Sequence, residues 1–130
     1  MTVTSIEKDP AALTMTITSH FDAPVDRVWQ LWADPRQLER WWGPPTYPAT
    51  VEQHDLVPGG TVTYFMTGPE GDKSRGWWRV EAVEAPRRLA FVDGFADDAG
   101  KPNLDMPTTT TQVTIDDAKD GARMVIETTF

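Results

Sequence analysis

The sequence contains no cysteine, which excludes a disulfide scaffold, thiol catalysis and a cysteine-based zinc site. It also lacks any apolar run near the roughly 18 residues that a membrane-spanning helix needs. Positive charge is scarce, with 12 lysines and arginines against 20 aspartates and glutamates, and the basic residues form no cluster. We therefore expect neither nucleic acid nor an anionic membrane as a partner, because both are bound through clustered lysines and arginines.

Motifs of common enzyme classes are missing as well. There is no G-x-S-x-G elbow, no G-x-G-x-x-G loop, no P-loop and no H-E-x-x-H pair. The two histidines, His20 and His54, fall on different expected strands, and a metal site would need them to meet with a carboxylate. We therefore expect no metal and no cofactor. The first ten residues hold no basic segment followed by an apolar one, so we expect no signal peptide and a cytoplasmic protein.

The chain length of 130 residues is typical of a single domain, and we expect one domain over residues 1–130. Residues 1–12 show no clear pattern and are expected to form an irregular lead-in. Apolar and polar residues then alternate from Leu13 to Phe21, and this period of two predicts a half-buried strand.

Two short helices are expected after this strand. Within residues 22–33 the apolar positions follow helical spacing and define one apolar face, made of Val25, Val28, Trp29 and Trp32. Pro24 suits the first helical position, where its missing N–H costs nothing. Asp34 is expected to cap a second helix over Arg36–Trp41, with Pro35 opening it.

The remainder of the chain predicts strands joined by turns. The expected strands are Thr50–Leu56, Thr61–Thr67, Gly76–Val83, Leu89–Phe95, Thr110–Asp116 and Arg123–Thr129. A long loop is expected over Ala96–Pro107. One strand, two helices and then a run of hairpin-spaced strands favour an α+β fold with a strongly curved antiparallel sheet.

Aromatic residues give the strongest functional signal, since the chain holds six tryptophans. The residues expected to face inward define an apolar concavity with a few polar groups, which is typical of a small-molecule pocket. A filled core is the alternative interpretation of the same residues. The candidate ligand-binding residues are Trp41, Trp42, His54, Val62, Tyr64, Met66, Trp78, Val80, Phe91, Asp93, Phe95, Val113, Ile115 and Met124.

Three of these residues are candidates for acid–base chemistry. Asp93 shares the phase of Leu89, Phe91 and Phe95, so an inward side chain would be a carboxylate in apolar surroundings with a raised pKa. A position at the sheet rim, near solvent, is the alternative for Asp93. Tyr64 and His54 complete the set, although His54 also suits an ordinary surface position. His20 is expected to point outward.

Six short motifs, in order, resemble one family. They are Trp41-Trp42-Gly43-Pro44, Pro58-Gly59-Gly60, Gly68-Pro69-Glu70-Gly71, Gly76 at a strand start, Pro86-Arg87-Arg88-Leu89 and Asp105-Met106-Pro107. Over residues 13–130 the sequence is similar to the heat-shock chaperone ATPase activator-like family of the START-like (SRPBCC, helix-grip) superfamily. The resemblance implies a seven-stranded antiparallel sheet wrapped around a long C-terminal helix, with a hydrophobic cavity between sheet and helix.

The sequence departs from that family pattern at Phe130, where the family continues into the long helix. A large exposed apolar patch is unfavourable, so the inner face of the sheet needs a cover. We expect either a homodimer that covers this face or exposed apolar surface.

Three functions are compatible with the resemblance and the residues. The first is a non-enzymatic START-like domain that binds a small hydrophobic or aromatic ligand. The second is a chaperone ATPase activator-like accessory protein, implied by the family alone, with the chaperone as partner. The third is a polyketide cyclase or hydrolase-like enzyme that would use Asp93, Tyr64 and His54.

Overall fold

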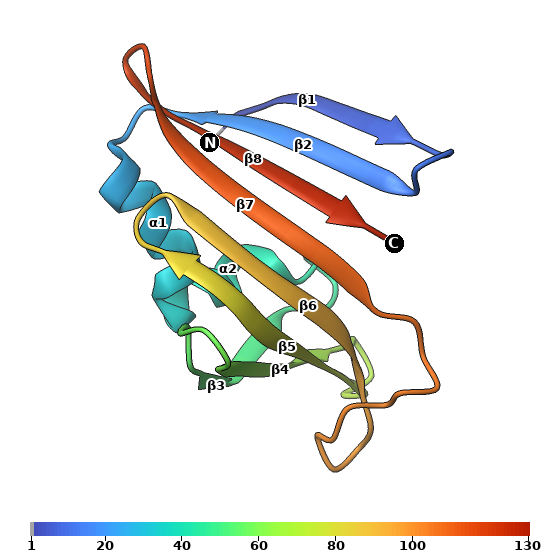
Figure 1. Cartoon of the computed structure of the whole chain (residues 1–130). Coiled ribbons are helices and arrows are strands. Elements are labelled where there is room, and N and C mark those ends of the chain that lie inside the picture. Colours follow the sequence, from blue (N-terminus) through green and yellow to red (C-terminus); the bar gives the residue numbers. More distant parts are fainter. Residues whose placement is uncertain (1) are drawn as a thin grey trace.

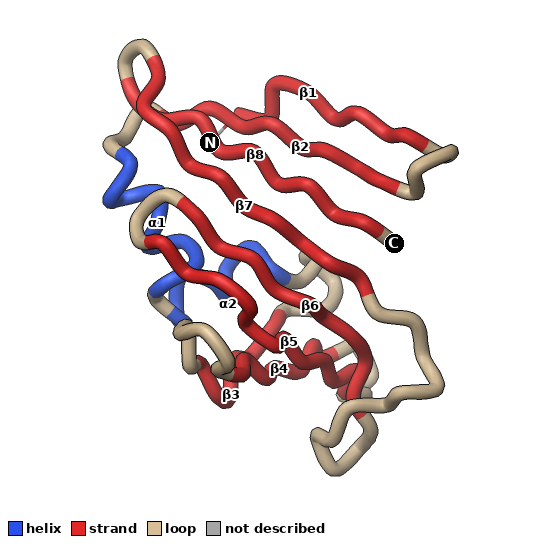
Figure 2. Tube along the Cα trace, in the orientation of Figure 1, coloured by secondary structure: helices blue, strands red, loops and turns tan. Residues whose placement is uncertain are grey.

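A computed structural model describes residues 2–130 and shows an eight-stranded antiparallel sheet with two helices packed on one face (Figures 1 and 2). We call this the inner face. The strand order is β1-β2-β8-β7-β6-β5-β4-β3. The elements are β1 (Thr2–Asp9), β2 (Thr14–Phe21), α1 (Val25–Ala33), α2 (Pro35–Trp42), β3 (Ala49–His54), β4 (Thr61–Thr67), β5 (Lys73–Glu84), β6 (Arg88–Ala96), β7 (Thr109–Ala118) and β8 (Gly121–Thr129).

The path of the chain explains why the helices lie on the inner face. After β2 the chain must reach β3, which forms the far edge of the sheet. Helices α1 and α2 make this crossing, and Figure 1 shows them beneath the curved strands. The chain then returns one antiparallel strand at a time until β8 pairs with β2. The predicted α+β architecture is thus confirmed, with eight strands in place of the expected seven.

The additional strand is β1, so the expectation of an irregular lead-in over residues 1–12 is wrong for Thr2–Asp9. β1 pairs with β2, and Ile6 lies opposite Ile17. The register shifts between Val3 and Ser5 at a bulge. Because the bulge breaks the period of two, alternation that would have revealed the strand does not appear in the sequence.

The helix starts largely follow the expectations. α2 begins at Pro35, and the Asp34 carboxylate accepts the Arg36 backbone N–H at 2.9 Å, as expected of a cap. Pro24 is the residue before α1 and not its first helical residue, so that expectation is wrong by one position. Its ring still suits the extended backbone there, and its carbonyl accepts the first helical hydrogen bonds.

Two side chains complete the end of α1. The last carbonyls of a helix have no partner within the helix. The Trp41 indole donates to the Leu31 carbonyl at 3.0 Å, and His54 Nε2 lies 2.9 Å from the Trp32 carbonyl. α2 and the edge strand β3 are thereby fixed to the end of α1.

The core is an aromatic cluster between the helices and the inner face. Trp32 is fully buried, and its ring lies within 4.7 to 6.3 Å of four other aromatic rings, those of Trp41, Trp42, Trp78 and Phe91. Trp78 and Phe91 stack in parallel at 4.0 Å across β5 and β6. The Trp32 indole N–H also contacts the Met124 sulfur at 3.3 Å, which ties α1 to β8.

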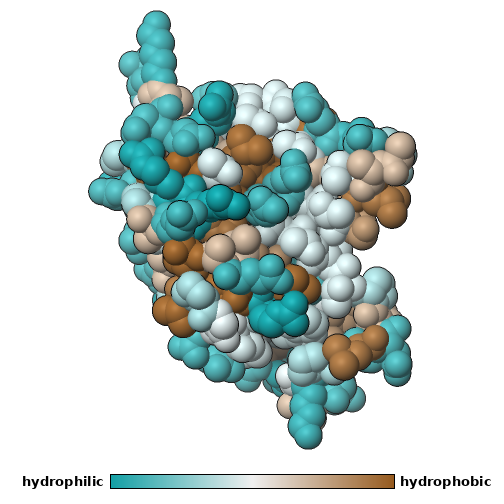
Figure 3. Space-filling model, in the orientation of Figure 1, coloured by the Kyte–Doolittle hydropathy of each residue, from teal (hydrophilic) through white to brown (hydrophobic). Residues whose placement is uncertain are grey.

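Apolar side chains remain exposed on the part of the inner face that the helices leave open. Ile6 on β1 is 58% exposed, and Phe130 after β8 is 60% exposed. Figure 3 shows apolar patches on the surface of the molecule. Apolar side chains are therefore exposed on this face of the single chain, and the homodimer expected to cover them stays a prediction. Neither described helix is long and apolar enough to cross a membrane.

The cap of α2 gives a stability prediction. Asp34→Ala removes the acceptor of the Arg36 N–H and should lower the free energy of unfolding by about 1 kcal/mol. Asp34→Asn keeps a capping oxygen and should lie within about 0.5 kcal/mol of the unchanged protein, because Asn and Asp cap almost equally well. Urea unfolding followed by tryptophan fluorescence measures both. Equal losses in the two variants would contradict the capping role.

Candidate functional site

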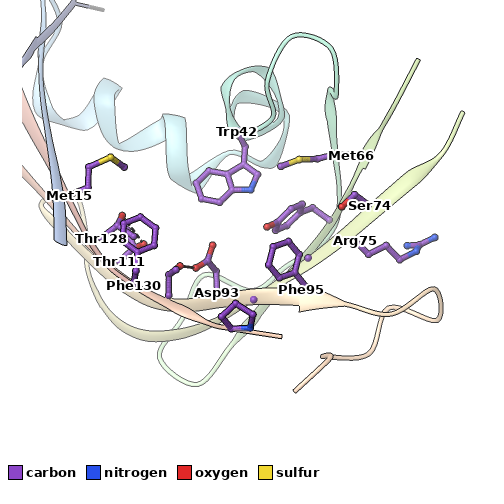
Figure 4. A pocket seen from close by; sticks show the side chains of 15 residues that line it. Met15, Trp42, Met66, Ser74, Arg75, Asp93, Phe95, Thr111, Thr128 and Phe130 are labelled. Carbon is purple, nitrogen blue, oxygen red and sulfur yellow. Dashed lines mark hydrogen bonds between the residues drawn. The ribbon is translucent and has the colours of Figure 1, made fainter. Parts of the chain in front are cut away.

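The inner face holds a pocket of about 400 Å³ beside the end of α2 (Figure 4). Strands β2, β4, β5, β6, β7 and β8 supply its walls, together with the loop before β7 and the residue after β8. The lining residues are Met15, Trp42, Tyr64, Met66, Ser74, Arg75, Gly76, Asp93, Gly94, Phe95, Pro107, Thr109, Thr111, Thr128 and Phe130. An apolar concavity with a few polar groups is the usual form of a small-molecule site.

Trp42 forms the side of the pocket that faces the helices. It is the last residue of α2, so the crossing helices determine its position. Its ring packs edge-on against Trp78 at 4.8 Å and against Tyr64 at 6.0 Å. Figure 4 shows the indole above the sheet, with Asp93 on the strand beneath it.

The Tyr64 ring lies close against the sheet because the residue beneath it is a glycine. Tyr64 on β4 and Gly76 on β5 are direct cross-strand partners. A Cβ at Gly76 would lie 2.4 Å from both Cζ and Oη of Tyr64, so no other residue fits beneath the ring. The expected role of Gly76 as a strand start is wrong, since β5 begins earlier, at Lys73. The glycine is needed for this close approach.

Asp93 lies on β6, which is separated from the Tyr64 strand by β5 alone. It points inward, as its phase with Phe91 predicts, and accepts a hydrogen bond from the hydroxyl of Thr109, its partner on β7. Burial raises the pKa of the Asp93 carboxyl, while the Thr109 hydrogen bond and a backbone hydrogen bond act in the opposite direction. Of the two positions that the sequence left open for Asp93, the structure shows the inward one.

The Tyr64 hydroxyl is held in its neutral form. Burial raises its pKa to about 12, the nearby Trp42 and Trp78 indoles lower it, and the charge of Asp93 raises it. The indole N–H groups of Trp42 and Trp78 are buried, yet neither has a hydrogen-bond partner within residues 2–130. A buried donor without an acceptor costs about 1–3 kcal/mol, so these two groups form an unsatisfied polar feature beside the pocket.

Five of the candidate ligand-binding residues line the pocket, namely Trp42, Tyr64, Met66, Asp93 and Phe95. A second set belongs to the filled core instead, where each side chain is at most 3% exposed: Val62, Trp78, Val80, Phe91, Val113, Ile115 and Met124. The structure therefore combines the two interpretations that the sequence left open. The inner face is packed beneath the helices and hollow beyond them.

Two candidates lie elsewhere. Trp41 lines a separate cavity of about 290 Å³ between the helices and β2. His54 does not line the pocket, and its ring contacts the Trp32 carbonyl. The structure thus brings Asp93 and Tyr64 to one pocket but leaves His54 out of it. His20 is exposed, as expected, and contacts the Thr4 hydroxyl at 3.3 Å.

Several lining residues were not identified from the sequence. They are Met15, Ser74, Arg75, Gly76, Gly94, Pro107, Thr109, Thr111, Thr128 and Phe130. Thr111 and Thr128 share the phase of Val113 and Ile126, so alternation could have placed them on the inner face. Their hydroxyls lie 3.3 Å apart across β7 and β8. Within residues 2–130, no three histidine, aspartate or glutamate side chains gather in a group that could hold a metal ion.

Comparison with known proteins identifies relatives of the whole fold. A family model described as Activator of Hsp90 ATPase homolog 1-like protein matches residues 22–130. The crystal structure of protein Ms6760 from Mycobacterium smegmatis is 52% identical, with a TM-score of 0.87, over 98% of this chain and 78% of that one. A solution structure of an Arthrobacter aurescens protein is 51% identical, with a TM-score of 0.92, over 99% of this chain and 75% of that one.

More distant structures share the fold alone. The AHSA1 protein from Silicibacter pomeroyi is 19% identical, with a TM-score of 0.74, over 90% of this chain and 79% of that one. No curated protein matches the chain.

The buried carboxyl gives a pH prediction. The folded-state pKa of Asp93 is raised above its unfolded value, so its contribution to stability is complete below the ordinary pKa of 3.8 and is lost as pH rises through the raised value. Asp93→Asn keeps an acceptor for the Thr109 hydroxyl. Because asparagine does not ionise, the variant does not lose stability at this position as pH rises. The unfolding free energy of the variant, relative to the unchanged protein, should therefore increase as pH rises from about 4 towards 7.

Urea unfolding at a series of pH values measures this difference. Asp98→Asn is the matched control, because Asp98 is exposed in the loop after β6. A difference between Asp93→Asn and the unchanged protein that stays constant with pH, or one that Asp98→Asn reproduces, would contradict the assignment.

Proposed function

This chain belongs to the Activator of Hsp90 ATPase homolog 1-like family, and we propose that it acts as a non-enzymatic START-like domain that binds a small hydrophobic ligand. The pocket beside Trp42 is the single observation that supports this proposal most directly. Its volume of about 400 Å³ suits a molecule of moderate size. Its walls combine aromatic and aliphatic side chains with a few oriented polar groups.

The chemistry of the pocket favours binding over catalysis. Cyclase or hydrolase chemistry with Asp93, Tyr64 and His54 would need the three groups at one substrate, and His54 contacts a helix carbonyl instead. With a pKa of about 12, Tyr64 keeps its proton near neutral pH and is a poor base. Asp93 and Tyr64 can still orient a bound molecule through hydrogen bonds.

Access supports the same proposal. Phe95 on β6 and Phe130 after β8 both line the pocket, and they are 48% and 60% exposed. A ligand can therefore enter the pocket past these two exposed side chains, and the bound ligand would cover part of their apolar surface. Burial of apolar surface would then contribute roughly 25 cal/mol per Å² to binding.

A charge placed at this margin tests the proposal. Phe95→Glu should weaken binding of the uncharged dye Nile red by about tenfold or more, because an ionised carboxylate at the pocket wall disfavours an apolar guest. The side chain is 48% exposed, so the fold should tolerate the change. Dye fluorescence during titration gives the dissociation constant.

Leu104→Glu is the matched control, since Leu104 is 82% exposed and lies outside the pocket lining. Its dissociation constant should equal that of the unchanged protein. Equal weakening in both variants would indicate general adhesion of the dye to apolar surface and would count against the pocket.

A further inference from the structure

The most informative unexplained feature is the pair of buried indole donors beside the pocket. Trp42 lines the pocket, and Trp78 lies directly behind it with ring centroids 4.8 Å apart. Neither indole N–H has a hydrogen-bond partner among residues 2–130. In contrast, Trp32, Trp41 and Trp77 all donate to an acceptor within the protein, at 2.9 to 3.3 Å.

The hydroxyl of Tyr64 belongs to the same group of donors. Both indole N–H groups lie close enough to its oxygen to lower its pKa, as donors to the phenolate would, but neither reaches the geometry of a hydrogen bond with it. The phenol keeps its proton and Tyr64 lines the pocket, so its O–H can donate to a guest there. An oxygen atom of a ligand is the kind of acceptor that this group lacks.

The charges around the pocket restrict what that oxygen can belong to. Asp93 is the acidic residue of the lining, and it disfavours an anion whenever it is ionised. Arg75 is the basic residue of the lining, but its guanidinium binds Glu52 at 2.7 Å and lies over the Phe65 ring. Figure 4 shows the Arg75 side chain directed away from the pocket. No cation of the lining is therefore left to pair with a carboxylate or a phosphate.

We propose that the pocket selects an uncharged molecule with an apolar body and one acceptor oxygen, such as a ketone carbonyl, which binds at the Trp42 and Tyr64 donors. This inference rests on the proposed ligand-binding function and names the class of ligand. The apolar body lies against Met66 and Phe95, and the oxygen accepts from the Tyr64 hydroxyl and from Trp42, the one of the two unpartnered indoles that lines the pocket.

Three probes with one shared body test the proposal by calorimetry at pH 7.5. They are 2-acetylnaphthalene, which carries the carbonyl, 2-ethylnaphthalene, which lacks it, and 2-naphthoate, which carries a charge. The ketone should bind about tenfold more tightly than the hydrocarbon, since one or two buried donors gain an acceptor. The carboxylate should bind more weakly than the ketone by a similar factor of about ten.

Tyr64→Phe removes one donor and keeps the ring over Gly76. It should reduce the affinity for the ketone about fivefold and leave the affinity for the hydrocarbon unchanged. Tyr47→Phe is the matched control, because Tyr47 is the other tyrosine of the chain and bonds to Asp72 away from the pocket. This variant should change neither affinity.

The outcomes separate this inference from the function on which it rests. If ketone and hydrocarbon bind equally, or if the carboxylate binds most tightly, the pocket binds ligands but the inference is wrong. If Tyr64→Phe weakens both neutral probes alike, the hydroxyl does not contact the carbonyl and the inference is also wrong. If none of the three probes binds, the proposed function fails and the inference fails with it.

Discussion

The packing of indole rings into the curve of the sheet is the interaction on which the rest of this structure depends. Trp32 reaches from α1 to the stacked pair of Trp78 and Phe91, and its N–H meets the sulfur of Met124. These contacts join the crossing helices to the middle strands of the sheet. Aromatic pairs in such geometries add stability beyond the area that they bury.

The end of this packed region also creates the pocket. α2 stops at Trp42, and no helix of the described residues 2–130 covers the part of the inner face that lies beyond it. Val62 and Val80 are covered and fully packed, whereas Met66 and Phe95 are not. Core and pocket are therefore two parts of one apolar face, and the border between them lies where α2 ends.

Local pattern predicted the elements well, because each strand or helix carries its own period. Strand β4 was predicted over its full range, and Asp34 was identified as the cap of α2. β1 could not be found, since its bulge removes the regular alternation between Val3 and Ile6. Such a defect is visible only once the partner strand is known.

The pocket was predicted less completely for a related reason. Alternation indicates which face of a sheet a residue occupies, but not whether a helix covers that position. Asp93 and Val113 both face inward, yet one lines the pocket and the other is packed beneath the helices. His54 was misplaced because its partner is a main-chain carbonyl of α1, and nothing in the sequence near His54 indicates that contact.

The two glycines of the pocket wall have a consequence for its shape. The Tyr64 ring covers Gly76, and the Trp77 ring covers its cross-strand partner Gly94 on the outer face of the sheet. At both positions a Cβ would meet an aromatic ring at less than 3 Å, so bare main chain lies directly against the ring that covers it. The backbone at Gly76 and Gly94 therefore sets how closely the two rings approach the sheet. Substitutions of neighbouring side chains can change the lining of the pocket without moving this part of its wall.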